Sequence, residues 1–215
     1  MESNRNPFSA MAEQYDLWYD TAFGAAAFRQ EISCLRLACP EYSGAWLEIG
    51  VGSGRFAREL GIACGLDPTP EMLRLAAARG IEVHQGRAEA LPFPDAAFDG
   101  VLLAFALCFL ADPGKALQEC RRVLRPGGSL LLGFVPSGSS WGRHYVHKAA
   151  AGHPLYSKAV FYSIAEVVGM TDIAGFSLKN AASALFSPPE EQPDPNAGAI
   201  PVGDEKAGFA ALRLL

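Results

Sequence analysis

Short apolar runs alternate with amphipathic helical segments through the middle of the chain, a pattern typical of an α/β fold. The apolar runs have the length of strands and are bounded by Gly, Pro and Asp. Strands are expected over residues 45–49, 62–66, 81–85, 98–104 and 129–134. Helices are expected between them, from Arg55 onward and over residues 70–78 and 115–124. Strands separated by helices predict a parallel sheet with right-handed crossovers and helices on both faces.

Both ends of the chain depart from this alternation. Residues 8–37 carry aromatic and small apolar residues at helical spacing, which predicts two helices with a break at Gly24. Residues 136–162 are rich in Gly, Ser, His and aromatic residues and contain no clear strand. Two late strands, over residues 176–186 and 206–214, flank a loop rich in Pro and acids, and they predict an antiparallel hairpin at the sheet edge. The expected fold is a Rossmann-like three-layer sandwich with a mixed seven-stranded sheet.

Composition and charge narrow the class of protein. Half of the 215 residues are hydrophobic and the formal net charge is -5, so a large core is expected and nucleic acid is a poor partner. The polar start of the chain predicts no signal peptide, and the longest apolar run, residues 101–110, is too short to span a membrane. Five cysteines without a C-x-x-C pair predict reduced thiols and a cytoplasmic protein.

The first predicted strand runs into a glycine loop at residues 50–54, where a ligand could approach the backbone closely. Arg55 stands where the dinucleotide-binding fingerprint has its third glycine. Glu48 precedes the loop; its charge would repel a pyrophosphate but suits a cofactor with an ammonium group. Asp67, at the tip of the next strand, can accept hydrogen bonds from ribose hydroxyls. Taken separately, each acid could instead cap a helix or form a salt bridge.

Four segments in order resemble class I S-adenosylmethionine (SAM)-dependent methyltransferases, in the type 11 subgroup that includes ubiquinone-biosynthesis enzymes. They are LEIGVGSGRF at residues 47–56, GLDPTPEML at 65–73, AEALPFPDAAFD at 88–99 and RVLRPGG at 122–128. The resemblance is strong over about residues 42–134 and implies SAM as cofactor and a methyl acceptor as substrate. The two leading helices predict a helical cap over residues 1–40, ahead of a SAM-binding domain over 41–215. Residues 136–162 follow the fifth strand and carry aromatic residues with polar groups, which predicts a substrate lid; the alternative is a surface helix whose aromatic residues pack on the sheet.

The resemblance also implies the cofactor-binding positions. They are Glu48, Gly50, Val51 and Gly52 around the methionine part, Asp67 at the ribose, Pro68 and Met72 on the adenine face, Ala88 and Glu89 at its edge, Ala104 and Phe105 near the sulfonium, and Tyr15 and Tyr19 from the leading helices. The two tyrosines could equally be packing residues. Arg87 stands where many relatives have an Asp that accepts from the adenine amino group, and Arg cannot accept that bond.

No catalytic residue is predicted, because methyl transfer from SAM is an in-line displacement that needs alignment before it needs a base. No metal is expected: His144, His147 and His153 lack further ligands at suitable spacing. Cys108 is either a nucleophile or a buried thiol. We expect methyl transfer to a small molecule held by the leading helices and residues 136–162. The alternatives are an NAD-dependent oxidoreductase and a SAM-binding regulatory protein without turnover.

Overall fold

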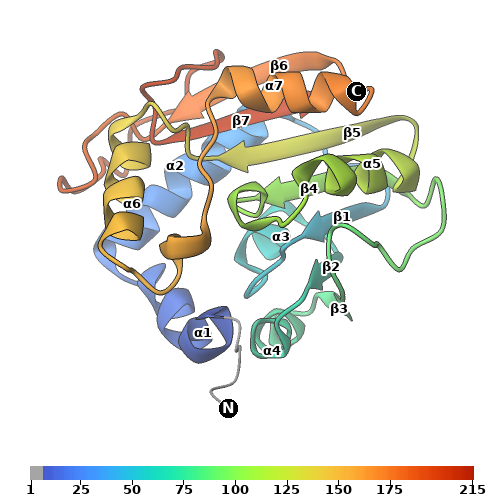
Figure 1. The fold of residues 1–215 in the computed structure, drawn as a ribbon, viewed down its shortest axis with the longest axis horizontal. Coiled ribbons are helices and arrows are strands. Elements are labelled where there is room, and N and C mark those ends of the chain that lie inside the picture. Colours follow the sequence, from blue (N-terminus) through green and yellow to red (C-terminus); the bar gives the residue numbers. More distant parts are fainter. Residues whose placement is uncertain (1–6) are drawn as a thin grey trace.

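A computed structural model describes residues 7–215 and shows a seven-stranded sheet in the order β3-β2-β1-β4-β5-β7-β6 (Figure 1). The strands are β1 (Trp46–Ile49), β2 (Cys64–Asp67), β3 (Glu82–Gln85), β4 (Phe98–Ala104), β5 (Leu124–Phe134), β6 (Leu178–Ala184) and β7 (Phe209–Leu214). The first five are parallel, and β7 is antiparallel to both β5 and β6. The predicted mixed sheet with its late hairpin is therefore confirmed. The strand order reverses between β1 and β4, where open α/β sheets bind ligands.

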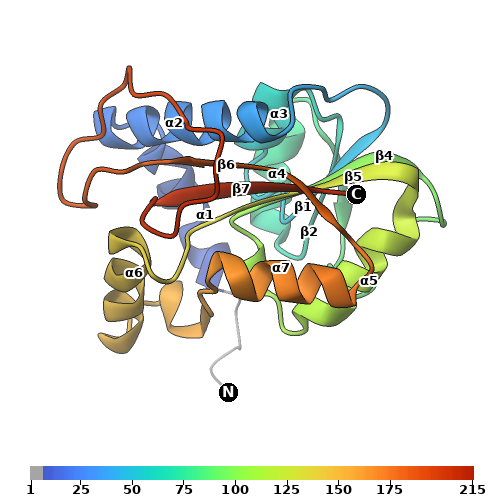
Figure 2. The same ribbon diagram turned by 90° about the horizontal axis from the view of Figure 1, so that it is seen from above.

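Helices cover both faces of this sheet. They are α1 (Pro7–Trp18), α2 (Ala22–Ala38), α3 (Arg55–Leu60), α4 (Pro70–Ala78), α5 (Pro113–Val123), α6 (Ser140–Ala150) and α7 (Ile164–Ile173), with 3-10 turns η1 (Leu107–Phe109) and η2 (Tyr156–Lys158). Figure 2 shows α2 and α3 on one side of the sheet and α5 and α7 on the other. This arrangement confirms the predicted three-layer sandwich.

The two faces of the sheet belong to separate hydrophobic clusters because successive residues of a strand point to opposite faces. Leu102 and Leu131 pack in the cluster beneath α2 and α3. Their neighbours Val101 and Leu130 pack in the cluster beneath α5. All four side chains are fully buried. Burial on both faces explains why the central strands read as continuous apolar runs.

The break between the first two helices is not at Gly24, which corrects the prediction. The chain turns at residues 19–21, and the Thr21 side chain accepts the Gly24 N–H at 3.0 Å as the N-cap of α2. A Cβ at position 24 would lie only 2.0 Å from the Trp18 carbonyl oxygen. Glycine is therefore needed here because the two helices approach closely, and it lies in the first turn of α2.

The strand β5 begins earlier than predicted. Residues 125–128, which separate the predicted helix from the predicted strand, lie within β5, and β5 starts where α5 ends. Leu124 pairs with Phe98, and the register then shifts before Ser129 pairs with Gly100. This irregularity accommodates a Pro and two Gly residues in a strand, because neither type supports a regular ladder.

Two helices meet at the carboxyl ends of the strands. In Figure 1 the arrowheads of β4 and β5 point toward α6, and α1 lies below it. Residues 136–162, predicted to lack a strand, form α6 and η2. Residues 1–6 of the expected helical cap lie outside the described residues, and α2 packs against β5, β6 and β7. No helix within residues 7–215 is both long and apolar enough to cross a membrane. A cytoplasmic location stays a prediction.

Candidate active site

The glycine loop is held against the end of β2 by backbone hydrogen bonds. The Gly50 and Val51 N–H groups both donate to the Leu66 carbonyl, at 2.7 and 3.0 Å. Gly50 and Gly52 have φ angles of 72° and 50°, in the left-handed region that favours glycine. A Cβ at Gly50 would also lie 2.6 Å from the Ala106 side chain. The loop is therefore a fixed turn whose glycines keep the space above it open.

Asp67 binds the same loop through its side chain. Its carboxylate accepts the Gly52 N–H at 3.0 Å and the Thr69 N–H at 2.8 Å. Burial raises the pKa of Asp67 above its ordinary value, although these hydrogen bonds favour the charged form. A carboxylate has about four lone-pair positions, so each oxygen can accept a further bond from a ligand hydroxyl. Asp67 both shapes the loop and offers acceptors to a ribose.

A cavity of about 390 Å³, here called the cofactor cavity, opens above this loop. Most of the predicted cofactor positions line it: Tyr15, Gly50, Gly52, Asp67, Pro68, Met72, Ala88, Glu89, Ala104 and Phe105. Its wall combines an acidic acceptor with apolar residues such as Leu66 and Met72. This combination fits a nucleoside. Its ribose hydroxyls can donate to the carboxylate, and its flat base can lie against the apolar residues.

The remaining predicted positions lie outside this wall. Glu48 is almost fully buried beneath the loop, and its Oε2 atom has no hydrogen-bond partner within residues 7–215. Burial raises the pKa of Glu48 well above its ordinary value. Val51 packs in the core cluster beneath α2 and α3. Tyr19 lines a second cavity instead. Their contact with a cofactor stays a prediction.

Arg87, the departure from the family pattern, lies in the wall of the cofactor cavity beside Glu89. Its Nε atom is 3.4 Å from a Glu89 carboxylate oxygen. The other Glu89 oxygen accepts the Ala111 N–H at 3.0 Å. Glu89 therefore has structural partners of its own, and it tethers the segment that follows η1 to the wall of the cofactor cavity.

An ion cluster that the sequence analysis did not identify fastens α1 to the glycine loop. Asp16 of α1 accepts from Arg55 Nε and from Arg79 Nη2, both at 2.7 Å. Arg79 also donates to the carbonyl of Ser53 in the loop at 2.8 Å, and Arg55 reaches Asp20 at 2.9 Å. Burial opposes the charged form of Asp16, but hydrogen bonds from Arg55, Ser53 and Arg79 outweigh it and lower its pKa to about 2. The arginine in place of the third fingerprint glycine thus anchors the leading helix.

We expect Asp16→Asn to lower the free energy of unfolding by about 2 kcal/mol at pH 7, because folding lowers the pKa of Asp16 from 3.8 to about 2. Because the pKa is lowered in the folded state, the stabilisation exists above the ordinary Asp pKa of 3.8 and is lost as the pH falls toward 2. Urea unfolding of the wild-type protein and of Asp16→Asn from about pH 2 to about pH 7, which covers this window, measures the difference in stability.

Asp20→Asn is the matched control, because the Asp20 side chain is 57% exposed and, among residues 7–215, forms an ion pair with Arg55 only. Asp20→Asn should lower the free energy of unfolding by less than about 1 kcal/mol, because an exposed ion pair contributes little stability. Equal effects of the two substitutions would show that Asp16 is an ordinary surface partner.

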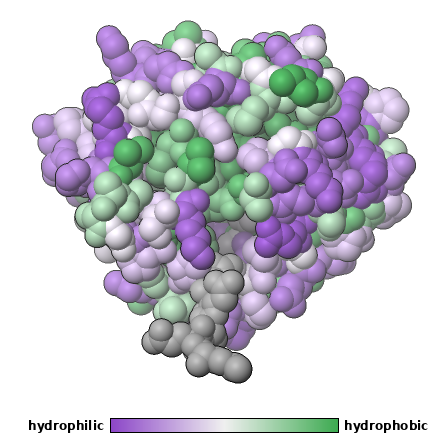
Figure 3. Space-filling view, viewed as in Figure 1, coloured by the Kyte–Doolittle hydropathy of each residue, from purple (hydrophilic) through white to green (hydrophobic). Residues whose placement is uncertain are grey.

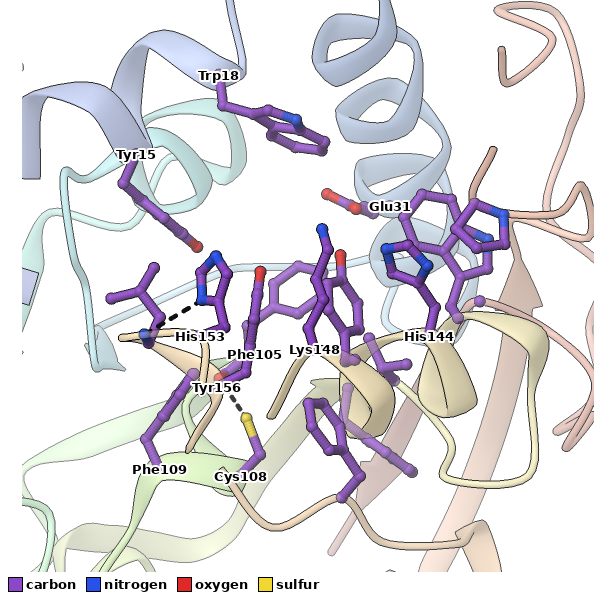
Figure 4. Close-up of a pocket in the computed structure, with 18 of the residues that line it drawn as sticks. Tyr15, Trp18, Glu31, Phe105, Cys108, Phe109, His144, Lys148, His153 and Tyr156 are labelled. Atoms are coloured by element: carbon purple, nitrogen blue, oxygen red, sulfur yellow. Dashed lines mark hydrogen bonds between the residues drawn. The ribbon is translucent and has the colours of Figure 1, made fainter. Parts of the chain in front are cut away.

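A second cavity, of about 320 Å³, adjoins the first and is here called the aromatic cavity. Figure 4 shows side chains that line this cavity. Figure 3 shows hydrophobic residues gathered at the centre of the face that is also seen in Figure 1. Helices α1, α2 and α6 and both 3-10 turns contribute to its wall. The two cavities share Phe8, Tyr15, Phe105, Phe109 and Leu155. A ligand in one cavity would therefore lie next to a ligand in the other.

Phe105, between the two cavities, has a strained backbone. Its φ angle is 59°, which is uncommon for a bulky residue. The Phe105 N–H donates to the Gly133 carbonyl at 2.8 Å, and its ring contacts Phe56 and Phe209. Such conformations persist only where the surroundings fix them, and they cluster at functional sites. Phe105 separates the two cavities at the predicted sulfonium position.

None of the titratable groups considered from sequence has the properties of a nucleophile or a metal site. Burial raises the pKa of the Cys108 thiol to about 12, so the thiol is neutral at pH 7. His153 accepts the Leu155 N–H through Nδ1 at 3.3 Å, and His144 lies 3.4 Å from Glu190. Within residues 7–215, no group of three or more Cys, His, Asp or Glu side chains is placed to hold a metal ion.

Comparison with known proteins identifies the class. The methyltransferase domain model matches residues 47–132. A Mycobacterium tuberculosis protein described as uncharacterized is 41% identical over 178 residues, 83% of this chain and 62% of that protein. The demethylmenaquinone methyltransferase of Roseiflexus castenholzii is 30% identical over 195 residues, 86% of this chain and 79% of that enzyme. The crystal structure of a Thermotoga maritima SAM-dependent methyltransferase, described as a possible histamine N-methyltransferase, is 33% identical, covers 97% of each chain and has a TM-score of 0.89.

The fold and the loop define a Rossmann-like protein whose cofactor cavity fits a nucleoside. The chain belongs to the class I SAM-dependent methyltransferases, in the type 11 family, and its cofactor is SAM. Neither the NAD-dependent oxidoreductase nor the regulatory protein without turnover is favoured by these comparisons. The chain spans 62% of the length of its mycobacterial relatives.

Proposed function

We propose that this protein transfers the methyl group of SAM to a small molecule bound in the aromatic cavity. The observation that carries the proposal is the pair of adjoining cavities with shared walls. The cofactor cavity has the ribose acceptor Asp67 and the glycine loop, and the aromatic cavity is lined by rings with polar atoms at their edges. Cavities of this size and lining suit small organic ligands.

The residues of this chain contribute alignment and exclusion of water. When bound, SAM supplies the activated methyl group. Asp67 and the loop would hold its nucleoside part, and Phe105 would position the acceptor against it. Helices α1 and α6 would cover the site, since Tyr15 and Tyr145 line its wall. Such positioning accounts for a large share of the rate in a displacement of this kind.

The proposal is tested by release of S-adenosylhomocysteine (SAH) in the presence of defined amines, phenols and hydroquinones. Histamine and a menaquinone precursor belong in this panel because of the relatives' descriptions. SAM should bind in the micromolar range or tighter, equivalent to about -8 kcal/mol. Calorimetry that shows NAD binding without SAM binding would contradict the proposal.

Tyr145→Ala should lower turnover by about 10- to 100-fold while leaving SAM affinity within about twofold, because it removes a wall of the acceptor site only. Tyr145 stacks on Phe161 at 5.8 Å between ring centroids, and it also contacts Tyr156. His147→Ala, on the exposed face of the same helix, is the matched control. Normal turnover in Tyr145→Ala would place the acceptor outside the aromatic cavity.

A further inference from the structure

The wall of the aromatic cavity includes one buried acid, Glu31. Glu31 lies on α2, is 4% exposed and lines the cavity. Figure 4 shows its carboxylate directed toward the centre of the cavity, between Trp18 and Lys148. Its Oε2 atom has no hydrogen-bond partner within residues 7–215.

Gln30, the residue before Glu31 in α2, shows how a buried polar side chain of this helix finds hydrogen-bond partners. Gln30 is equally buried; its Nε2 donates to the Asp194 carbonyl at 2.7 Å and its Oε1 accepts the Leu185 N–H at 3.1 Å. Glu31 has no comparable pair of hydrogen bonds with any described residue. An unpaired buried polar group costs free energy, and an unpaired buried charge costs more. A carboxyl group in this position therefore indicates a partner that arrives with a ligand.

The rings around Glu31 indicate the charge of that partner. Tyr15, Trp18, Tyr19, Phe23, Trp141 and Tyr145 all line the same cavity. Aromatic faces attract cations, and cages of such rings recognise ammonium groups. A carboxylate together with aromatic faces favours an organic cation over an anion or a neutral ligand of the same shape.

Resting on the proposed function, we infer that the methyl acceptor carries a positively charged nitrogen that Glu31 binds inside the aromatic cage. The acceptor is thus a small organic amine or a related nitrogen cation with an apolar body. Glu31 is therefore a residue that determines specificity for the acceptor.

Lys148 also lines the cavity and is the alternative partner for Glu31. Its Nζ atom lies 5.9 Å from the centroid of the Tyr145 ring. Within residues 7–215, no Lys, Arg or His nitrogen lies within 4.0 Å of the Glu31 carboxylate. The described residues therefore place no counter-charge beside the Glu31 carboxyl group.

The test uses SAH-loaded full-length protein and two probes of matched shape, phenethylamine and phenethyl alcohol. We expect the wild-type protein to prefer the ammonium probe, and Glu31→Gln to weaken its binding by about 10- to 100-fold, as for a lost charge-assisted bond. Binding of the alcohol should change by less than about threefold. Glu41→Gln, an exposed acid outside the cavity, is the matched control.

Proton release on binding of the cation is a second measurement, and it would not change if Glu31 had only a structural role. Burial raises the pKa of Glu31 to about 8, so binding of a cation at pH 6.5 should release about one proton, and Glu31→Gln should release none. The other titratable groups facing the cavity or Glu31 are Tyr15, Tyr19, Cys34, Cys108, His144, Tyr145, Lys148, His153, Tyr156 and Tyr162. Calorimetry in two buffers of different ionisation enthalpy measures the release.

The outcomes separate this inference from the proposed function. Loss of the ammonium preference in Glu31→Gln, with SAH affinity unchanged, supports the inference. Any of three results overturns the inference. The wild type has no preference for the ammonium probe, or does not bind this probe at all. Alternatively, binding of this probe is lost in Lys148→Met but not in Glu31→Gln. In each of those overturning cases methyl transfer to a neutral acceptor could still occur. Failure of the wild type to bind SAM would instead remove the proposed function.

Discussion

Asp67→Ala is expected to weaken SAM binding by about 30- to 1000-fold, or roughly 2–4 kcal/mol. The physical reason is the loss of an ionised acceptor for ribose hydroxyls, each such charge-assisted bond contributing about 1.5–3 kcal/mol. The side chain also holds the Gly52 and Thr69 N–H groups, so the variant should lose some stability as well. Calorimetric titration with SAM, together with thermal unfolding, separates the two effects.

Glu71→Ala provides the control for this experiment. Glu71 lies four residues further along the chain, at the start of α4, is exposed and does not line the cofactor cavity. Removing its charge should change SAM affinity by less than about twofold. If Asp67→Ala folds and binds SAM as the wild type does, the carboxylate serves only to hold the backbone.

The second large effect concerns stability and pH. Without ligand, Glu31→Gln should be more stable than the wild type, and the difference should grow from pH 4.5 to pH 8, approaching about 3–5 kcal/mol. The folded protein keeps the Glu31 proton up to about pH 8, whereas the unfolded chain releases it near 4.5. The folded state therefore binds more protons in this window, and wild-type stability falls as the pH rises.

Urea unfolding of both proteins in steps across this window measures the effect. The raised pKa values of Glu48 and Asp67 act on both proteins equally, so the difference isolates Glu31. Parallel stability curves for the two proteins would show that Glu31 is hydrated or paired in solution.

The sheet and the cofactor loop could be predicted from sequence because their signals are local. The glycine loop and the acid at the next strand tip follow from backbone requirements within short segments, and the apolar strands follow from burial on both faces. The errors have a physical origin too. The sequence pattern predicts a helix break at Gly24, but a glycine is required there because the backbone lies against the carbonyl of Trp18 in another helix.

The ion cluster could not be predicted because its contacts join distant parts of the chain. Asp16 meets Arg55 and Arg79, which are 39 and 63 residues away. The position of Glu31 is visible in the sequence pattern of α2. Its neighbours one helical turn away, Ala27 and Leu35, are fully buried, so an acid stands in the middle of the apolar stripe of α2.

The attachment of α1 has a consequence for how two ligands influence each other. Phe8 and Tyr15 of α1 belong to the walls of both cavities, while Asp16 ties the same helix to Arg55 and Arg79 beside the glycine loop. A shift of α1 would therefore change both cavities at once. If the cofactor steadies this helix, it raises the affinity for the acceptor, and reciprocity requires the acceptor to raise the affinity for the cofactor by the same factor. Departure of one product would then loosen the hold on the other.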